Sequence, residues 1–327
     1  MIGSGRRDLL RSVAFAAGTS ALSGFQIKAQ EQPGTARLFP GFKASRVETK
    51  EAVIKVVSAG NGPPLLLLHG APQTLATWHK IAPWLAAEFT VVAADLRGYG
   101  DSSKPPDGVN HSGYSKRAMA QDQVEVMEHF GFKKFAVVGH DRGARVAHRM
   151  ALDHGERVTK AAVLDIVPTY KLFQSVNLEF ASSYYHFFFL TQPAPFPETL
   201  IGNSLEFFMG GEKSETQAEY LRCMKIPATL HAMCEDYRAA ATIDLAHDRA
   251  DLNRKIECPL LVLWTERGST SPAQRAPIRP MGQMFDLLSV WRERAKQVRG
   301  KGLPGGHALQ ELVPEETLAE LQAFLRS

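Results

Sequence analysis

The chain has few cysteines and no long apolar run, and both scarcities exclude classes of protein. Only Cys223, Cys234 and Cys258 occur among 327 residues, so the sequence predicts no disulfide-based framework. The apolar stretch at residues 13–25 is too short to span a bilayer as a helix, and no other part of the chain predicts a stable membrane span. Repeats and low-complexity tracts are absent as well. A composition that is 44% hydrophobic and 22% charged is typical of a globular protein with one large α/β domain.

The net charge is also small over most of the chain. The formal net charge is +4, but residues 1–29 hold four basic side chains and one acidic side chain, so about +1 is left for the remainder. No basic patch stands out there, and this excludes nucleic acid as an expected partner.

The N-terminal segment is typical of a targeting signal. Arg6 and Arg7 are followed by Asp8-Leu9-Leu10, a weakly apolar stretch and then Ala29, after which cleavage is expected. The segment resembles a twin-arginine export signal at residues 1–29. It predicts a periplasmic location, with the cytoplasm as the alternative if the signal does not function.

Short apolar runs alternate with helical patterns in the rest of the chain. Buried strands are predicted at residues 63–70, 89–100, 134–141, 160–168 and 258–264. Helices are predicted at 74–88, 116–131 and 314–327, with Pro314 in a first helical turn. This alternation predicts an α/β fold with a mostly parallel sheet covered by helices on both faces.

The alternation stops at residues 169–254. That segment is rich in aromatic residues and proline, and its length between two strands is typical of a mainly helical cap over the carboxyl ends of the strands. We therefore expect the core in two parts, residues 30–168 and 255–327, with the cap at 169–254.

A strand-to-helix turn of the form Gly-x-Asp-x-Gly stands at residues 139–143. This pattern is typical of a nucleophile elbow, except that Asp141 replaces the usual serine or cysteine. The alternative is that Asp141 only caps the following helix. A carboxylate is already ionised at neutral pH, so Asp141 can attack an sp³ carbon directly and form an enzyme-bound ester.

Hydrolysis of that ester needs a base, and His307 lies in a glycine-rich loop before the last helix, where the triad histidine is expected. Two acids could orient it: Asp165 at the end of a predicted strand, which we favour, and Glu266 after another. The backbone N–H groups of Ala71 and Arg142 are the predicted oxyanion donors, and Pro72 is expected to hold its loop rigid, with a cis bond as one way of doing so.

These residues together resemble a known family. The match includes the segments "HGAPQT", "DLRGYGDSSKP", "YHFFFLTQPAPFPE" and "CEDYRA" besides the elbow. From about residue 38 onward the chain is similar to the haloacetate dehalogenases of the α/β-hydrolase superfamily, fluoroacetate dehalogenase included. The resemblance implies the α/β-hydrolase fold and displacement of halide from a 2-haloacetate to give glycolate.

The same resemblance assigns Arg142 and Arg145 to the substrate's carboxylate. Their i, i+3 spacing puts both on one helix face, where guanidinium groups can orient the substrate carbon for in-line attack. Epoxide hydrolases share the Asp elbow but usually carry an apolar aromatic residue at the position of Arg142.

The expected halide pocket departs from the family at one position. His186 and Tyr237 match the family's halide donors, but Phe187 stands where the family has tryptophan. Phenylalanine has no N–H to donate, which removes a hydrogen bond worth about 1–3 kcal/mol to a charged acceptor. Fluoride is the poorest leaving group, so we expect chloroacetate and bromoacetate to be better substrates than fluoroacetate.

The sequence therefore predicts a hydrolytic dehalogenase of small 2-haloacids that needs no metal or organic cofactor. An epoxide hydrolase or esterase on the same Asp-His-Asp scaffold is the alternative, with Tyr184, Tyr185 and Tyr237 available to protonate an opening oxide. A non-catalytic small-molecule receptor is the alternative from another class. The expected partner is a small anionic substrate, and a homodimer is compatible with the sequence.

Overall fold

A mostly parallel sheet forms the centre of the molecule. The structure is a computed structural model that describes residues 37–210, 214–268 and 279–327. Within them lies an eight-stranded sheet of order β1-β2-β4-β3-β5-β6-β7-β8. The strands are β1 Lys43–Glu48, β2 Val53–Ala59, β3 Pro64–Leu68, β4 Thr90–Ala94, β5 Phe135–His140, β6 Val158–Leu164, β7 Leu260–Thr265 and β8 Val298–Leu303. β2 pairs antiparallel with β1 and with β4, and all other neighbouring strands of this sheet pair parallel, which confirms the predicted fold class.

The five predicted strands correspond to β3 to β7, whereas β1, β2 and β8 were missed. β1 and β8 are the two edge strands, and most of their side chains are exposed or half-buried. Their sequences, KASRVE and VRGKGL, therefore lack the continuous apolar run that identifies a central parallel strand.

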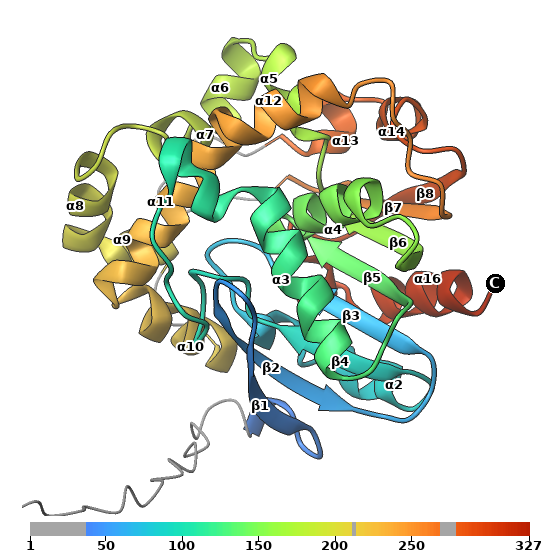
Figure 1. Cartoon of the computed structure of the whole chain (residues 1–327). Helices are drawn as coiled ribbons and strands as arrows, with labels where there is room; N and C mark the ends of the chain where they lie inside the picture. The colour runs from blue at the N-terminus through green and yellow to red at the C-terminus, as the bar shows by residue number, and fades with distance from the viewer. Residues whose placement is uncertain (1–36, 211–213, 269–278) are drawn as a thin grey trace, which may run out of the picture. The chain divides into compact units, whose positions relative to one another are not determined.

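Two hydrophobic cores lie on opposite faces of the sheet, because successive strand residues point to opposite sides. Leu66 and Leu68 pack with helices α3 (Lys116–His129) and α4 (Arg142–Asp153), and Leu65 and Leu67 pack with α2 (Ala82–Ala86) and α16 (Pro314–Arg326) (Figure 1). The helices of the core are η1 Leu75–Trp78, α2 Ala82–Ala86, η2 Val109–Tyr114, α3 Lys116–His129, α4 Arg142–Asp153, α13 Met281–Met284, α14 Leu287–Arg292, α15 Leu309–Leu312 and α16 Pro314–Arg326.

The helix predicted at residues 74–88 is wrong as a single element. The chain forms the 3₁₀ turn η1 and then the short helix α2 instead. Pro83 lies in the first turn of α2, where its missing N–H costs nothing. In a continuous helix the same proline would remove a backbone hydrogen bond and clash with the preceding turn. The helices predicted at 116–131 and 314–327 are present as α3 and α16.

A series of helices is inserted between β6 and β7. They are α5 Thr169–Gln174, α6 Leu178–Ser183, α7 His186–Phe189, α8 Phe196–Asn203, α9 Leu205–Met209, α10 Glu215–Met224, α11 Pro227–Ala241 and α12 Ile243–Ala250. Figure 1 shows them beyond the carboxyl ends of the parallel strands. This insertion falls within the range predicted for the cap, and we call it the cap below.

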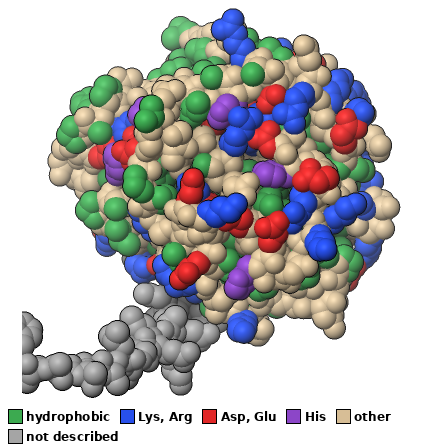
Figure 2. Space-filling view, in the orientation of Figure 1, with side chains coloured by type: hydrophobic (Ala, Val, Ile, Leu, Met, Phe, Trp, Pro, Cys, Tyr) green, Lys and Arg blue, Asp and Glu red, His purple; other side chains and the backbone are tan. Residues whose placement is uncertain are grey.

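The surface shows no segregation of charge on the face seen in Figure 2, where basic and acidic side chains are interspersed. The thiols of Cys223, Cys234 and Cys258 are all free. Among the described helices none combines the length and apolar character needed to cross a membrane. The predicted signal at residues 1–29 lies outside the described residues and stays a prediction.

Candidate active site

The Gly-x-Asp-x-Gly turn joins β5 to α4 and exposes Asp141 at its apex. Asp141 has φ 46° and ψ −113°, a strained conformation that costs about 1–3 kcal/mol. Gly139 is needed for the turn itself, and Gly143 for its close approach to the backbone of residues 68 and 69. A Cβ on Gly139 would clash with the carbonyl oxygen of Gly143, and one on Gly143 would lie 2.5 Å from the carbonyl oxygen of His69.

Asp141 faces a cavity and does not cap α4. Its side chain makes no hydrogen bond with the first turn of that helix, which counts against the capping alternative. Instead Oδ1 accepts a hydrogen bond from the backbone N–H of Ala71 at 2.9 Å. Ala71 precedes Pro72 through a cis peptide bond.

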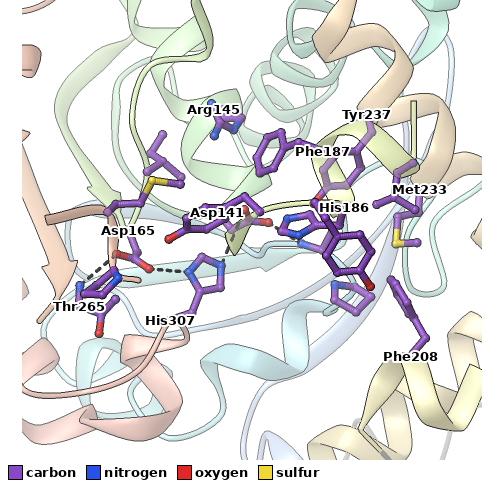
Figure 3. A pocket seen from close by; sticks show the side chains of 18 of the residues that line it. Asp141, Arg145, Asp165, His186, Phe187, Phe208, Met233, Tyr237, Thr265 and His307 are labelled. Atoms are coloured by element: carbon purple, nitrogen blue, oxygen red, sulfur yellow. Dashed lines mark hydrogen bonds and ion pairs between the residues drawn. The ribbon is translucent and has the colours of Figure 1, made fainter. Parts of the chain in front are cut away.

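His307 lies between Asp141 and Asp165 (Figure 3). Its Nδ1 is 2.5 Å from Oδ2 of Asp165, and its Nε2 is 3.8 Å from Oδ2 of Asp141. The other oxygen of Asp165 accepts a hydrogen bond from the backbone N–H of Thr265 at 3.0 Å, which fixes the carboxylate. Glu266, the alternative acid, is exposed and lies against Gly302 on β8. The structure thus brings Asp165 rather than Glu266 to the histidine.

The charges around the site set the protonation states of Asp141 and His307, on which the predicted ester mechanism depends. Burial raises the pKa of Asp141, but the positive charges of His307 and Arg142 lower it more, to about 2. Burial lowers the pKa of His307, but the hydrogen bond to Asp165 and the charges of Asp165 and Asp141 raise it to about 8. Asp141, the predicted nucleophile, is therefore ionised over the whole physiological range.

The pKa of His307 predicts how hydrolysis of the expected Asp141 ester depends on pH. Only neutral imidazole accepts a proton, so ester hydrolysis is expected to accelerate as pH rises through the pKa of His307. Esterification removes the negative charge of Asp141 that helps to raise this pKa. Single-turnover decay of the ester between about pH 6 and pH 9 should therefore follow an apparent pKa below 8. Asp165→Asn should shift the apparent pKa lower still. A decay rate independent of pH in the wild type would contradict His307 as the base.

The two arginines occupy different environments. Arg142 is fully buried, and its Nε and Nη2 donate to the carboxylate of Asp236 at 3.0 and 2.5 Å. Arg145 lines the cavity, and its Nη1 donates to the carbonyl oxygen of Val167 and the hydroxyl of Thr169, both at 2.9 Å. It forms no ion pair with any residue of the described ranges. The structure therefore separates two guanidinium groups that the sequence predicted to act together.

The three residues of the predicted halide pocket, His186, Phe187 and Tyr237, lie together on the cap side of the cavity. The rings of His186 and Phe187 are 5.9 and 5.4 Å from the ring of Tyr237, centroid to centroid. The Tyr237 hydroxyl makes no hydrogen bond within the described part of the chain. Burial raises its pKa, so it stays a proton donor. Burial lowers the pKa of His186 to about 4, so this imidazole is neutral at physiological pH.

The cavity has a volume of about 260 Å³ and lies between the core and the cap. Prediction from the sequence missed several of the cavity's apolar wall residues, among them Ile166, Phe208, Met233 and Met281. These side chains come from separate segments, so no local pattern identifies them. It also missed Asp236, although this residue stands directly before Tyr237 in the segment "CEDYRA".

Among the described residues, the one cluster of potential metal ligands lies outside this cavity. One group, Asp107, His231 and Glu235, brings potential ligand atoms within 4.8 Å of one another. Its members are already paired, His231 with Asp107 and Glu198, and Glu235 with His111. The groups around Asp141 include no such cluster in the ranges that the structure describes.

Comparison with known proteins gives one family match and several close relatives. The model of the α/β hydrolase fold family matches residues 63–278. A fluoroacetate dehalogenase from Burkholderia sp. is 44% identical over 300 residues, which cover 88% of this chain and 95% of that protein. A soluble epoxide hydrolase from Corynebacterium sp. strain C12 is 31% identical, with 79% of this chain and 88% of that protein covered. A crystal structure from Nostoc sp. PCC 7120, described as an α/β hydrolase, has 54% identity, a TM-score of 0.81 and coverage of 87% and 98%.

Proposed function

This chain belongs to the α/β hydrolases and is a hydrolase, and we propose that it removes the halogen from small 2-haloacids by way of an ester on Asp141. One observation carries the proposal: the ionised carboxylate of Asp141 and the buried guanidinium of Arg145, which has no acidic partner in the described ranges, line the same cavity. An anionic substrate with an electrophilic carbon fits both groups. Membership of this enzyme family removes the non-catalytic receptor from consideration.

The first step is a displacement at the carbon that carries the halogen. Oδ2 of Asp141 forms the new C–O bond, and the C–X bond breaks with its electron pair leaving as halide. We assign the attack to Oδ2 because Oδ1 already accepts the Ala71 N–H. Arg145 holds the carboxylate of the substrate so that the carbon faces Asp141, and orientation of this kind contributes much of the rate.

The second step is hydrolysis of the ester. Nε2 of His307 takes a proton from water, and the resulting hydroxide adds to the carboxyl carbon of Asp141. Negative charge develops on Oδ1, where the Ala71 N–H already points and where the N–H of Arg142 is the proposed second donor. The bond to Oδ2 then breaks, and His307 returns its proton to the leaving 2-hydroxy acid. Asp141 regains its carboxylate with one oxygen from water, and the second proton of the water goes to solvent.

Epoxide hydrolysis is the alternative, and the Corynebacterium relative supports it. A ring-opening reaction needs a proton donor near the oxide, and the unengaged hydroxyl of Tyr237 could serve. Tyr184 is less suited, since its hydroxyl already donates to the carbonyl oxygen of Arg279 at 3.0 Å. An epoxide has no charge to pair with Arg145, which would then stay buried and uncompensated at a cost of several kcal/mol. For this reason we rank the haloacid first.

Ion chromatography of released halide tests the proposal. The wild-type enzyme is expected to release chloride and bromide from chloroacetate and bromoacetate, and fluoride from fluoroacetate much more slowly. A matched panel of neutral epoxides and p-nitrophenyl esters serves as the comparison. Turnover of those compounds without halide release from any 2-haloacid would replace the dehalogenase with the alternative.

Phe187→Trp tests the expected order of the halides. The indole N–H restores a donor beside His186 and Tyr237, and fluoride depends most on such a donor. Fluoride release should rise about tenfold relative to chloride and bromide release. Phe187 is buried, so the larger ring could overpack the site, and the melting temperature must be followed in parallel. Phe188→Trp is the matched control, because Phe188 does not line the cavity. Efficient defluorination by the unaltered enzyme would mean that Phe187 is not the determinant.

A further inference from the structure

A buried network of charges stands behind the nucleophile. Asp236 is completely buried and contacts Arg142 through both carboxylate oxygens. Its main-chain oxygen accepts a further bond from Nη2 of Arg142 at 2.8 Å. The hydroxyl of Tyr99 donates to Asp236 Oδ2 at 2.7 Å, and Nζ of Lys116 contacts Oδ1.

The cations and carboxylates of this network are equal in number. Arg142 and Lys116 are the cations, and Asp236 and Asp244 are the carboxylates, with Nζ of Lys116 3.5 Å from Oδ2 of Asp244. Charges that are buried together and paired largely cancel at a distance. The network therefore adds little net positive charge to the cavity, although it contains one of the two arginines that follow the nucleophile.

Arg145 is the remaining buried arginine of the cavity, and Arg267, which also lines it, is exposed. Arg145 is the only buried arginine lining the cavity in the described ranges, and its hydrogen-bond partners are neutral. Burial and the neighbouring charge of Arg142 lower its pKa to about 10, so it still carries its charge at neutral pH. One uncompensated positive charge matches one carboxylate. A second negative charge on a ligand would meet Asp141 with no second unpaired buried cation beside it, because His307 is paired with Asp165 and Arg267 is exposed to solvent.

We propose that Asp236 is a specificity-determining residue, which cancels the charge of Arg142 and thereby restricts the site to monoanionic carboxylates. This inference rests on the proposed role of Arg145 in binding the carboxylate of the substrate. It adds that 2-halo monocarboxylates are substrates, whereas 2-halo dicarboxylates and phosphorylated compounds are excluded by charge rather than by size. Asp236 acts through Arg142 and touches no reacting atom.

Oxamate and oxalate are suitable probes because they have similar size and shape and differ by one charge at neutral pH. We expect the wild-type enzyme to bind oxamate at least about tenfold more tightly than oxalate, measured by titration calorimetry. A site with two uncompensated guanidinium groups would show the reverse preference. Equal or tighter binding of oxalate by the wild type would overturn the inference without any variant.

Asp236→Asn is the direct test, since it leaves Arg142 without a counter-charge. The ratio of the oxalate Kd to the oxamate Kd should fall about tenfold in this variant. The double variant Asp236→Asn with Arg142→Gln removes one charge of each sign and should bring the ratio back to within about threefold of the wild-type value. Asp122→Asn is the matched control. Asp122 is a buried partner of Arg97, bonded at 2.7 Å to its Nη2, and lies outside the cavity.

The outcomes separate this inference from the proposed function. A structural role alone for Asp236 would weaken both ligands equally, and an unchanged ratio in a folded Asp236→Asn protein would overturn the inference alone. Failure of both anions to bind the wild type would overturn it together with the proposed role of Arg145. If Asp236→Asn does not fold, the preference of the wild type for oxamate over oxalate and the Kd ratio of the double variant test the inference.

Discussion

His307→Ala enzyme incubated with chloroacetate is expected to become heavier by one carboxymethyl group, attached to Asp141. The first step needs no base, because a carboxyl group is ionised at neutral pH, and the charge of Arg142 and the N–H of Ala71 still lower the pKa of Asp141 when the charge of His307 is gone. The second step loses the group that activates water, since in the structure Nε2 of His307 faces Asp141 and Nδ1 is held by Asp165. The ester should therefore accumulate to one equivalent per chain.

The corresponding loss of steady-state turnover should be about 10³–10⁴-fold, the usual effect of removing a catalytic base of this kind. Intact-mass measurement followed by peptide mapping locates the label. Asp141→Asn is the control and should acquire no label. A label on another residue, or normal turnover by His307→Ala, would show that catalysis does not use an Asp141 ester.

Arg145→Met is expected to lower kcat/KM for chloroacetate by about 100- to 1000-fold, the effect of removing one partner of a buried charge pair. In the wild type Arg145 has no acidic partner among the described residues, so its charge is available to the substrate. Chloroacetamide has the same reacting carbon but no charge, and its kcat/KM should fall by less than about fivefold. Arg145→Lys keeps the charge without the planar fork and should give an intermediate loss.

A control for this prediction lies one turn further along α4. Arg149 is equally buried but pairs with Asp153 and Asp251, at 2.7 and 2.6 Å, and does not line the cavity. Arg149→Met should lower stability while leaving the preference for chloroacetate over chloroacetamide unchanged. Equal losses for the two substrates in Arg145→Met would reduce Arg145 to a structural role.

The nucleophile turn and the central strands could be predicted from the sequence because short-range rules govern them. At position 139 the sharp strand-to-helix turn needs glycine on local steric grounds, because a Cβ there would clash with the carbonyl oxygen of Gly143. Central parallel strands such as β5 are buried on both faces and therefore read as uninterrupted apolar runs. The chain order of Asp141, Asp165 and His307 follows from the order of these elements. Edge strands such as β1 and β8 were not predicted, because many of their side chains face solvent and are polar, so the strands lack a continuous apolar run.

Only the tertiary structure decided which charges meet. Asp165 and Glu266 both follow a central strand, and the packing of the loop that carries His307 selects the first. Arg142 and Arg145 share a helix face by their spacing, yet Asp236, which lies 94 positions after Arg142, pairs with Arg142, and Arg145 has only neutral partners among the described residues. The sequence alone thus determined the fold class and the candidate nucleophile, since both depend on local sterics and on the periodicity of apolar residues. The charge that a ligand meets depends on contacts between distant segments, because a buried ion is compensated by whichever opposite charge the folded chain places beside it.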